Sequence, residues 1–353
     1  MGRAMDATNA GAARRFTSVD VLRGWAVAAM LLVNYPGSWA HVYAPLEHSE
    51  WNGFTPTDLI FPNFLFVVGV SIALGLRPGT PLSKLWLRAL RLVAVGMLLY
   101  LVAMWGYDKD VFRPWGVLQR IGLCYGVAAT LALRLSPRAQ WGVIAAILLG
   151  YWTLLAASGG YAPLDNLASR VDNWMLGAHA YQFDAASGRG HDPEGLLSTL
   201  PAIATTLLGV RAGAWLRERG MRALVFAGIG ALALGWLWSW AMPWNKNLWT
   251  SSYAVYAAGW SLLLLALCHG LFDLRGWPPF GRSMGINAIT AYAGSWLMAC
   301  VLEKLGLFGA AYAQAATLFG DGKLASLAVA AAFVAFWWCL MWAMEKKGWR
   351  VTI

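Results

Sequence analysis

Long stretches of apolar residues recur along almost the whole chain, and they restrict its fold more than any other feature. A helix needs about 20 mostly apolar residues to cross the hydrocarbon core of a bilayer. Transmembrane β-strands alternate apolar and polar residues instead, so these stretches predict an all-α bundle of about ten membrane-spanning helices. The predicted spans are residues 23–41, 58–76, 86–105, 115–133, 140–158, 195–216, 222–242, 249–271, 283–302 and 324–344.

Composition and charge agree with a protein embedded in a lipid bilayer. Of the 353 residues, 59% are hydrophobic and only 12% are charged, which an ordinary soluble domain would not tolerate on its surface. Ten spans return both termini to one side, and if that side is the cytoplasm, most Lys and Arg residues lie on it, as membrane proteins require. The net charge of +10 therefore calls for no nucleic acid partner. We interpret residues 1–17 as a disordered cytoplasmic tail and residues 18–353 as one transmembrane domain.

The cysteines and histidines do not follow a metal-binding pattern. The four cysteines lie singly in apolar segments, and the five histidines are scattered. The sequence contains neither a Walker loop nor a dinucleotide-binding glycine motif. We therefore expect no metal and no disulfide.

The first predicted span contains polar side chains that a membrane helix does not need. An ionisable group inside the bilayer costs roughly 2.5 to 3.5 kcal/mol on insertion scales, so each one is a candidate functional residue. Ser18 and Asp20 could cap the helix while Asp20 pairs with Arg23 one turn later. Alternatively, this segment binds an anionic ligand at the inner face. Asn34 lies deeper in the same span.

Later segments add further polar side chains. Gln119 and Arg120 lie side by side about one turn inside the fourth predicted span. Arg120 either extends to the membrane surface, pairs with an acid such as Asp58, or faces a cavity. Asn245 and Lys246 lie in a connection rich in tryptophan, where an interfacial aromatic belt explains the tryptophans but not these polar residues.

A histidine precedes the second predicted span in the stretch HSEWNG. His48 lies ten residues before Asp58, and the span that follows contains Pro62 and Asn63, so we expect this loop to fold back over the bundle. Histidine can accept or deliver a proton near neutral pH. The long connection 159–194 lies on the same predicted outer side and is a second candidate for function, because long loops in compact proteins are usually functional or mobile.

Six segments in order along the chain carry a recognisable pattern: RFTSVDVLRGWAVAAMLLVNYPG at 15–37, HSEWNGFTPTDLIFPNFLFVVGVSIAL at 48–74, GVLQRIG at 116–122, DPEGLLSTLPAI at 192–203, PWNKNLWTSSY at 243–253 and GINAITAYAG at 285–294. The pattern resembles the family of the lysosomal enzyme heparan-α-glucosaminide N-acetyltransferase and its bacterial relatives, which are transmembrane acyltransferases. The resemblance covers almost the whole chain, and six ordered motifs are far more specific than any one of them.

The resemblance implies an enzyme that takes an acetyl group from cytosolic acetyl-CoA and delivers it to an amino sugar across the membrane. It implies that His48 is the active-site histidine and that Asn34 is the other active-site position. It also implies a homodimer. Because the sequence shows neither organelle signals nor a counterpart of the luminal domain of the lysosomal enzyme, we expect a multi-pass protein of a bacterial inner membrane.

The motifs and the predicted topology together define two sets of candidate binding residues. For the acceptor we expect Trp51, Asn52, Asp58, Asp192, Glu194, Asn245 and Lys246. For acetyl-CoA we expect Asp20, Arg23, Gln119, Arg120 and Asn287, with the nucleotide near the basic pairs Arg88 and Arg91 or Arg217 and Arg219. The pantetheine arm would reach His48 through a polar channel lined by Asn34, Asp58, Arg120 and Asn287.

Two chemical routes and two rival functions remain open at this point. His48 either removes a proton from the sugar amine, or it attacks the thioester first and forms an acetyl-imidazole. Asn34 or Asn52 could stabilise the developing oxyanion. The rival functions are transport of an amino sugar or of N-acetylglucosamine, and O-acetylation of cell-envelope glycans.

Overall fold

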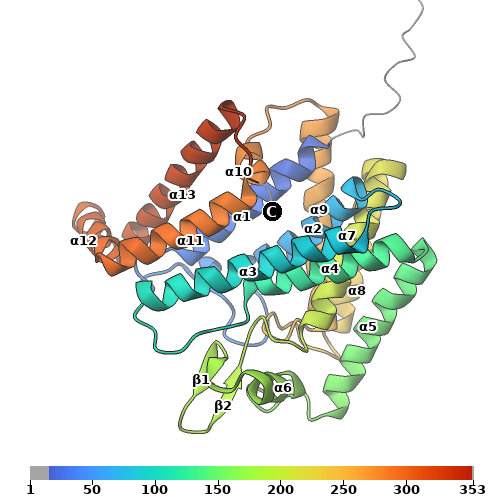
Figure 1. The fold of residues 1–353 in the computed structure, drawn as a ribbon, viewed down its shortest axis with the longest axis horizontal. Helices are drawn as coiled ribbons and strands as arrows, with labels where there is room; N and C mark the ends of the chain where they lie inside the picture. Colours follow the sequence, from blue (N-terminus) through green and yellow to red (C-terminus); the bar gives the residue numbers. More distant parts are fainter. Residues whose placement is uncertain (1–15, 352–353) are drawn as a thin grey trace, which may run out of the picture.

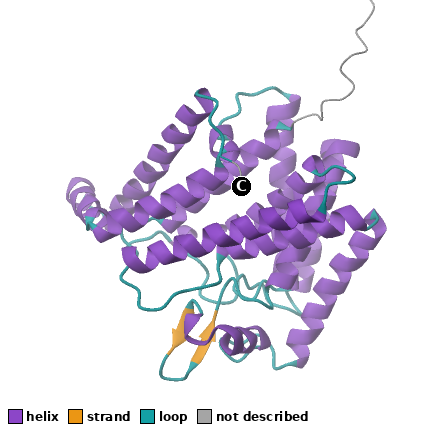
Figure 2. Cartoon of the chain, viewed as in Figure 1, coloured by secondary structure: helices purple, strands orange, loops and turns teal. Residues whose placement is uncertain are grey.

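The computed structural model describes residues 16–351 and consists almost entirely of helices (Figures 1 and 2). The predicted tail, residues 1–17, falls outside the described residues except for Phe16 and Thr17, and Thr17 begins the first helix. The elements are α1 (Thr17–Asn34), η1 (Ala44–Leu46), η2 (Pro56–Leu59), α2 (Ile60–Gly75), α3 (Leu82–Gly106), α4 (Val117–Arg134), α5 (Pro137–Ala157), α6 (Leu167–Leu176), η3 (Gly177–His179), β1 (Gln182–Asp184), β2 (Arg189–His191), α7 (Thr199–Glu218), α8 (Gly220–Trp238), α9 (Ser251–Cys268), η4 (His269–Leu274), α10 (Arg282–Ile286), α11 (Ala288–Lys304), α12 (Leu307–Phe319) and α13 (Gly322–Lys346).

Small residues let the central helices α2 and α7 approach each other closely. A Cβ atom on Gly69 would lie 1.9 Å from the carbonyl oxygen of Thr206, and one on Gly209 would lie 2.0 Å from that of Phe66. Close backbone contact through glycine is typical of helix pairs in membranes, where packing replaces the hydrophobic effect as the driving force. The α2–α7 pair therefore forms the rigid centre against which α4 and α9 pack.

The peripheral helices expose large apolar side chains. Leu90 on α3, Phe226 on α8 and Phe336 on α13 are 61%, 73% and 50% exposed. In water such a surface would drive association, but in a bilayer it is the normal face of an outer helix. The distribution of apolar surface confirms the membrane character that composition predicts.

Every predicted span overlaps at least one helix, but fewer than ten of these helices are apolar enough to be identified as spans. Within residues 16–351, six helices are long and apolar enough to cross a membrane, or seven if α11 and α12, which are bent by 80°, form one span. Helices α1, α4 and α7 fall below that apolarity, and each carries charged residues. The count of ten and the cytoplasmic position of both termini stay predictions.

The first helix begins and ends earlier than predicted. Asp273 holds its first turn, because the Ser18 N–H donates to Asp273 Oδ1 at 3.2 Å and the Ser18 hydroxyl donates to Oδ2. Ser18 and Asp20 therefore lie inside the helix, and the prediction that they cap it is wrong. The predicted ion pair is confirmed, with Arg23 Nη1 3.3 Å from Asp20 Oδ1. The helix ends at Asn34, since Pro36 disfavours a helical conformation for the residue before it.

The ninth predicted span is not continuous. Asn287, with φ −108° and ψ 33°, separates α10 from α11. After α11 the chain turns at Gly306, whose φ of +67° favours glycine, and continues as α12, a helix that the sequence analysis missed. Helix α12 has 13 residues, fewer than the about 20 that a membrane span needs, so a search for spans does not find it.

The connections at one end of the bundle pack into a small lobe, here called the loop lobe, which comprises residues 35–55, 107–116, 158–198 and 239–250. The long predicted loop 159–194 contains α6, η3 and the antiparallel hairpin β1–β2, all drawn at the lower edge of Figures 1 and 2. The Gly53 N–H donates to Trp244 O at 2.7 Å and so joins two of these connections. The prediction that the His48 loop folds back over the bundle is confirmed.

Candidate active site and its cavity

His48 is bound to Asp58 by a short hydrogen bond. Its Nδ1 lies 2.6 Å from Asp58 Oδ1, and its side chain is 49% exposed while that of Asp58 is fully buried. Asp58 Oδ2 accepts the backbone N–H groups of Ser49 at 3.1 Å and Thr55 at 3.0 Å. The Thr55 contact is one half of a capping box that starts η2. The carboxylate is thus held in one orientation, and it leaves Nε2 of His48 as the nitrogen that can meet a substrate.

The motif Trp-Asn-Gly fastens the His48 loop to the rest of the loop lobe. Trp51 Nε1 donates to Tyr161 O at 2.7 Å, and Asn52 Oδ1 accepts from Asn245 Nδ2 at 3.2 Å. Gly53 has a φ of +96°, in the left-handed region that favours glycine, and it forms a bridge with Asn245. The structure therefore brings together three of the predicted acceptor residues, Trp51, Asn52 and Asn245, beside His48.

A dense ion-pair network lies next to this loop. Arg113 donates to both oxygens of Asp192, through Nε at 2.9 Å and through Nη2, and also to Glu194 Oε2 at 2.7 Å. Burial alone would raise the pKa of Glu194, but Arg113, Lys246 and Arg120 outweigh it and lower that pKa to about 2. Burial lowers the pKa of Lys246, while Glu194 and Asp58 oppose the shift. Sequence reasoning missed Arg113, because its partners lie about 80 residues further along the chain.

Arg120 is fully buried, which excludes the interpretation that it extends to the membrane surface. Its Nη2 donates to Gly195 O at 2.9 Å and to the Ser198 hydroxyl, and no ion pair joins it to Asp58. Its guanidinium lies 5.2 Å from the ring centroid of Trp249, while its Nε and Nη1 have no hydrogen-bond partner among the described residues. Of the three predicted roles, surface contact and pairing with Asp58 are therefore both wrong.

A buried histidine and a buried acid support the segment that carries Glu194. His191 Nδ1 lies 3.0 Å from Ser169 Oγ and 3.9 Å from Asp172 Oδ2. Burial lowers the pKa of His191 to about 4 and raises that of Asp172 to about 7. Asp172 Oδ1 also accepts the Leu196 N–H at 2.9 Å. Near neutral pH this pair therefore has a neutral histidine and a carboxyl that is only partly ionised, which suits a buried structural role.

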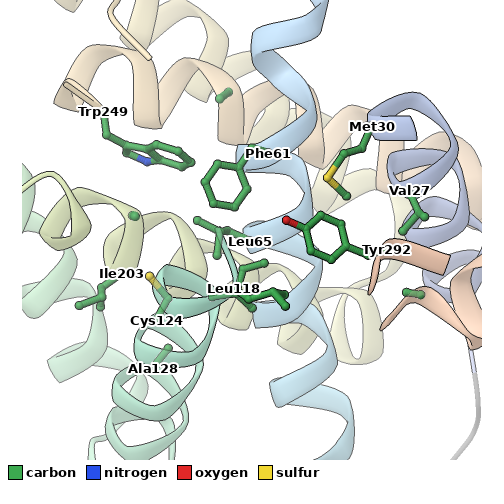
Figure 3. Packing of buried hydrophobic residues seen from close by; sticks show 14 of the residues in the cluster. Val27, Met30, Phe61, Leu65, Leu118, Cys124, Ala128, Ile203, Trp249 and Tyr292 are labelled. Carbon is green, nitrogen blue, oxygen red and sulfur yellow. The ribbon is translucent and has the colours of Figure 1, made fainter. Parts of the chain in front are cut away.

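A cavity of about 830 Å³ enters the bundle between α1, α2, α3, α4 and the α10–α11 junction. Five cations line it, and apolar side chains line its inner part, four of which are visible in Figure 3. The cations are Arg23, Arg77, Lys84, Arg88 and Arg91, and the apolar group includes Met30, Phe61, Leu118 and Tyr292. A basic mouth with an apolar interior fits a long ligand with an anionic head and a less polar arm.

The predicted donor residues contribute unequally to this cavity. Arg23 lines it, where Arg23 Nη2 donates to Ser71 Oγ at 2.7 Å. Asp20 lies beside Arg23 as its ion-pair partner. Gln119 is buried and donates to Pro114 O at 3.2 Å, and Asn287 is buried and accepts the Val351 N–H at 3.4 Å.

The lining also differs from the predicted polar channel. Asn34, Asp58, Arg120 and Asn287 are not among the lining residues, although the neighbours of Asn287 are. Asn34 lies half-buried at the end of α1, with no side-chain hydrogen bond among the described residues. Of the basic pairs proposed for the nucleotide, Arg88 and Arg91 line the cavity and Arg217 and Arg219 do not. No group of His, Cys, Asp or Glu within residues 16–351 could hold a metal ion.

The fold and the cavity define this chain as a multi-pass helical membrane protein with a deep, basic-mouthed site. A family model, described as heparan-α-glucosaminide N-acetyltransferase, catalytic, matches residues 15–241, and the chain belongs to this family. It is 31% identical to human heparan-α-glucosaminide N-acetyltransferase in an alignment 355 residues long. The alignment covers 79% of this chain and 52% of the human protein. The mouse protein of the same name is 29% identical over 367 residues, covering 81% of this chain and 54% of its own length. The chain therefore spans about half the length of these relatives, and the resemblance seen in the sequence is confirmed.

Proposed function

We propose that this protein transfers an acetyl group from acetyl-CoA, bound from the cytoplasmic side, to the amine of a glucosamine-type sugar at the opposite face. The observation that carries the proposal is the course of the cavity. Five cations line it, and of the α2 residues in its lining the nearest to Asp58 is Phe61, three residues after this carboxylate that holds His48. The segment from Asp58 to Phe61 thus links the apolar part of the cavity to the half-exposed imidazole of His48.

The basic mouth is suited to the nucleotide of CoA. Phosphate groups are bound by Arg and Lys through charge-assisted hydrogen bonds, and Arg88 and Arg91 lie one helical turn apart on α3, which lets both reach one anion. The apolar interior is suited to the pantetheine arm, which would lie along Met30 and Leu118 toward Phe61. With the mouth on the cytoplasmic side, these cations also follow the positive-inside rule.

His48 provides the acid–base chemistry in this proposal. A sugar amine is largely protonated at neutral pH and must lose a proton before it attacks the thioester carbon. Nε2 of His48 accepts that proton while Asp58 holds Nδ1–H and stabilises the imidazolium that forms. Alternatively, Nε2 attacks the thioester itself, expels CoA thiolate and passes the acetyl group from the imidazole to the sugar. Accumulation of acetylated protein in the absence of acceptor would identify the second route.

The acceptor binds among the residues around His48 in this proposal. Trp51 offers an apolar face to a sugar ring, Asn52 offers a polar group beside Asn245, and Lys246 offers one near Glu194. Asn34, or else Asn52, donates an amide N–H to the oxygen that becomes negative in the tetrahedral intermediate. The same proposal includes the location of the protein, a bacterial inner membrane, and its oligomeric state, a homodimer.

Purified protein in detergent tests the proposal directly. We expect free CoA thiol to appear when acetyl-CoA is supplied together with a glucosamine-type acceptor, and mass spectrometry should find the N-acetylated sugar. Acceptors that have hydroxyl groups but no amine serve as the control, and product formed on them would indicate O-acetylation instead. If thiol release does not depend on an acceptor and the protein carries sugar across the membrane of proteoliposomes, the protein is a transporter and the proposal is wrong.

A further inference from the structure

Phe61 marks the boundary between the cavity and the His48–Asp58 pair. It lines the inner end of the cavity, whereas neither His48 nor Asp58 is among the lining residues. Asp58 precedes it by three residues on the continuous segment η2–α2, and a helical rise of about 1.5 to 2 Å per residue places the two about 5 Å apart along the axis. Of the α2 residues that line the cavity, Phe61 is the nearest to Asp58 in the sequence, so a thioester that approaches His48 along this helix reaches the side chain of Phe61 first.

Trp249 forms a fixed surface behind Phe61. The two rings meet edge to face, with centroids 5.3 Å apart and planes at 85°. Trp249 is fully buried, its Nε1 donates to Thr205 Oγ1 at 3.0 Å, and Arg120 covers its ring. Its φ of +51° is a strained conformation for a bulky residue, and such strain persists only where the surroundings hold it. Trp249 is thus held from several directions.

Phe61 itself has no polar tether. Its ring is held by apolar packing alone, and Figure 3 shows it between Trp249 and Tyr292 in that view, with Met30 beyond. Its side chain rotates about only two bonds, so it can change its rotamer without a movement of the backbone. Trp249, which is buried and hydrogen-bonded, limits the space behind the ring of Phe61.

We propose that Phe61 determines which acyl groups this protein transfers, by closing the inner end of the donor cavity and admitting only short acyl chains to His48. The inference rests on the proposed function, since it names the donor class of the same site. The surroundings of Phe61 are apolar, so burial of a longer alkyl chain there would be favourable. In this proposal the size of the Phe61 side chain excludes it. A hydrophobic pocket discriminates by roughly 10- to 200-fold for each methylene, and this discrimination should depend on the size of residue 61.

The test compares acyl-CoA donors on variants of this position. We expect Phe61→Ala to raise the ratio of kcat/KM for butyryl-CoA over acetyl-CoA by about tenfold or more, with Phe61→Leu intermediate. Leu65→Ala is the matched control, because Leu65 is fully buried on the same helix but does not line the cavity. An unchanged ratio in folded Phe61→Ala or Phe61→Leu, or an equal change in Leu65→Ala, would overturn the proposal.

A binding measurement separates this inference from the proposed function. Non-hydrolysable thioether analogues of acetyl-CoA and butyryl-CoA are titrated by calorimetry into the same proteins without any acceptor. Selective weakening of the butyryl analogue in the unaltered protein, relieved in Phe61→Ala, supports the inference even if no acceptor is ever acetylated. Transfer activity combined with equal affinities and equal kcat/KM for both chain lengths overturns the inference alone. If neither analogue binds, both proposals fail.

Discussion

The Nδ1 atom of His48 lies 2.6 Å from Oδ1 of Asp58, and this contact joins a half-exposed imidazole to a fully buried carboxylate. The other carboxylate oxygen accepts the N–H groups of Ser49 and Thr55, so it cannot turn away. The ring of His48 is therefore oriented by the protein before any substrate arrives.

Removing either partner of the His48–Asp58 pair should reduce acetyl transfer to different extents. His48→Ala should lower kcat by about 10² to 10⁴, the usual contribution of a positioned histidine. Asp58→Asn keeps the size but loses a charged hydrogen bond of about 1.5 to 3 kcal/mol, so we expect a loss of roughly 10- to 150-fold. CoA thiol release measures both, and wild-type turnover in His48→Ala would exclude the proposed role.

Substitutions at the cavity mouth should weaken donor binding without slowing the chemistry. Arg88→Ala should raise KM for acetyl-CoA by roughly tenfold, with kcat nearly unchanged, because a charged hydrogen bond to phosphate is worth about 1.5 to 3 kcal/mol. The effect should shrink at high salt. Arg219→Ala is the control, since Arg219 does not line the cavity. A similar KM for acetyl-CoA in Arg88→Ala and Arg219→Ala would indicate that the nucleotide binds elsewhere.

Arg113 should be essential for the stability of the loop lobe. Arg113→Ala leaves the buried carboxylates of Asp192 and Glu194 without their cation, and breaking such a pair typically costs about 3 to 5 kcal/mol. Thermal unfolding in detergent should show a large drop in Tm. Arg189→Ala removes an exposed ion pair with Asp165 and should cost at most about 1 kcal/mol. Equal effects in the two variants would contradict the assigned burial.

Asp172 and His191 should act in opposite directions on the pH dependence of stability. The pKa of Asp172 rises from 3.8 to about 7 on folding, so between these values the folded state keeps the proton and stability falls as pH rises. The pKa of His191 falls from 6.5 to about 4, so between pH 4 and 6.5 the unfolded state holds more protons and stability rises with pH. In the unaltered protein the two effects largely cancel.

Asp172→Asn removes the first effect and leaves the second. Relative to the unaltered protein, the free energy of unfolding of the variant should therefore increase from about pH 4.5 to about pH 6.5, by at most roughly 3 kcal/mol. His191→Gln should show the opposite trend. Tm measured across this range in one detergent provides the comparison, with the exposed Asp165→Asn as control. A difference that does not vary with pH would refute the assignment.

Local patterns in the sequence predict much of the fold and part of the site. The ten apolar stretches predict where ten helices lie, because a helix satisfies its own backbone hydrogen bonds and its position depends on nearby residues. The ends of α1 were less predictable, since Asp273 stabilises its first turn from 255 residues away. Helix α12 was missed because its 13 residues are too few for a membrane span.

The sequence by itself determined that the chain is a helical membrane protein, which motifs it shares with its family, and which histidine and acids are candidates for chemistry. Only the tertiary structure decided that Asp58 holds His48, that Arg113 neutralises Asp192 and Glu194, and that Arg120 covers Trp249. It also decided which basic residues line the cavity and that Phe61 is among its apolar lining residues. The physical reason is that helical propensity and the transfer of apolar side chains from water to lipid depend on residues close together in the sequence. Ion pairs and cavities form between distant segments that only the packed bundle brings together.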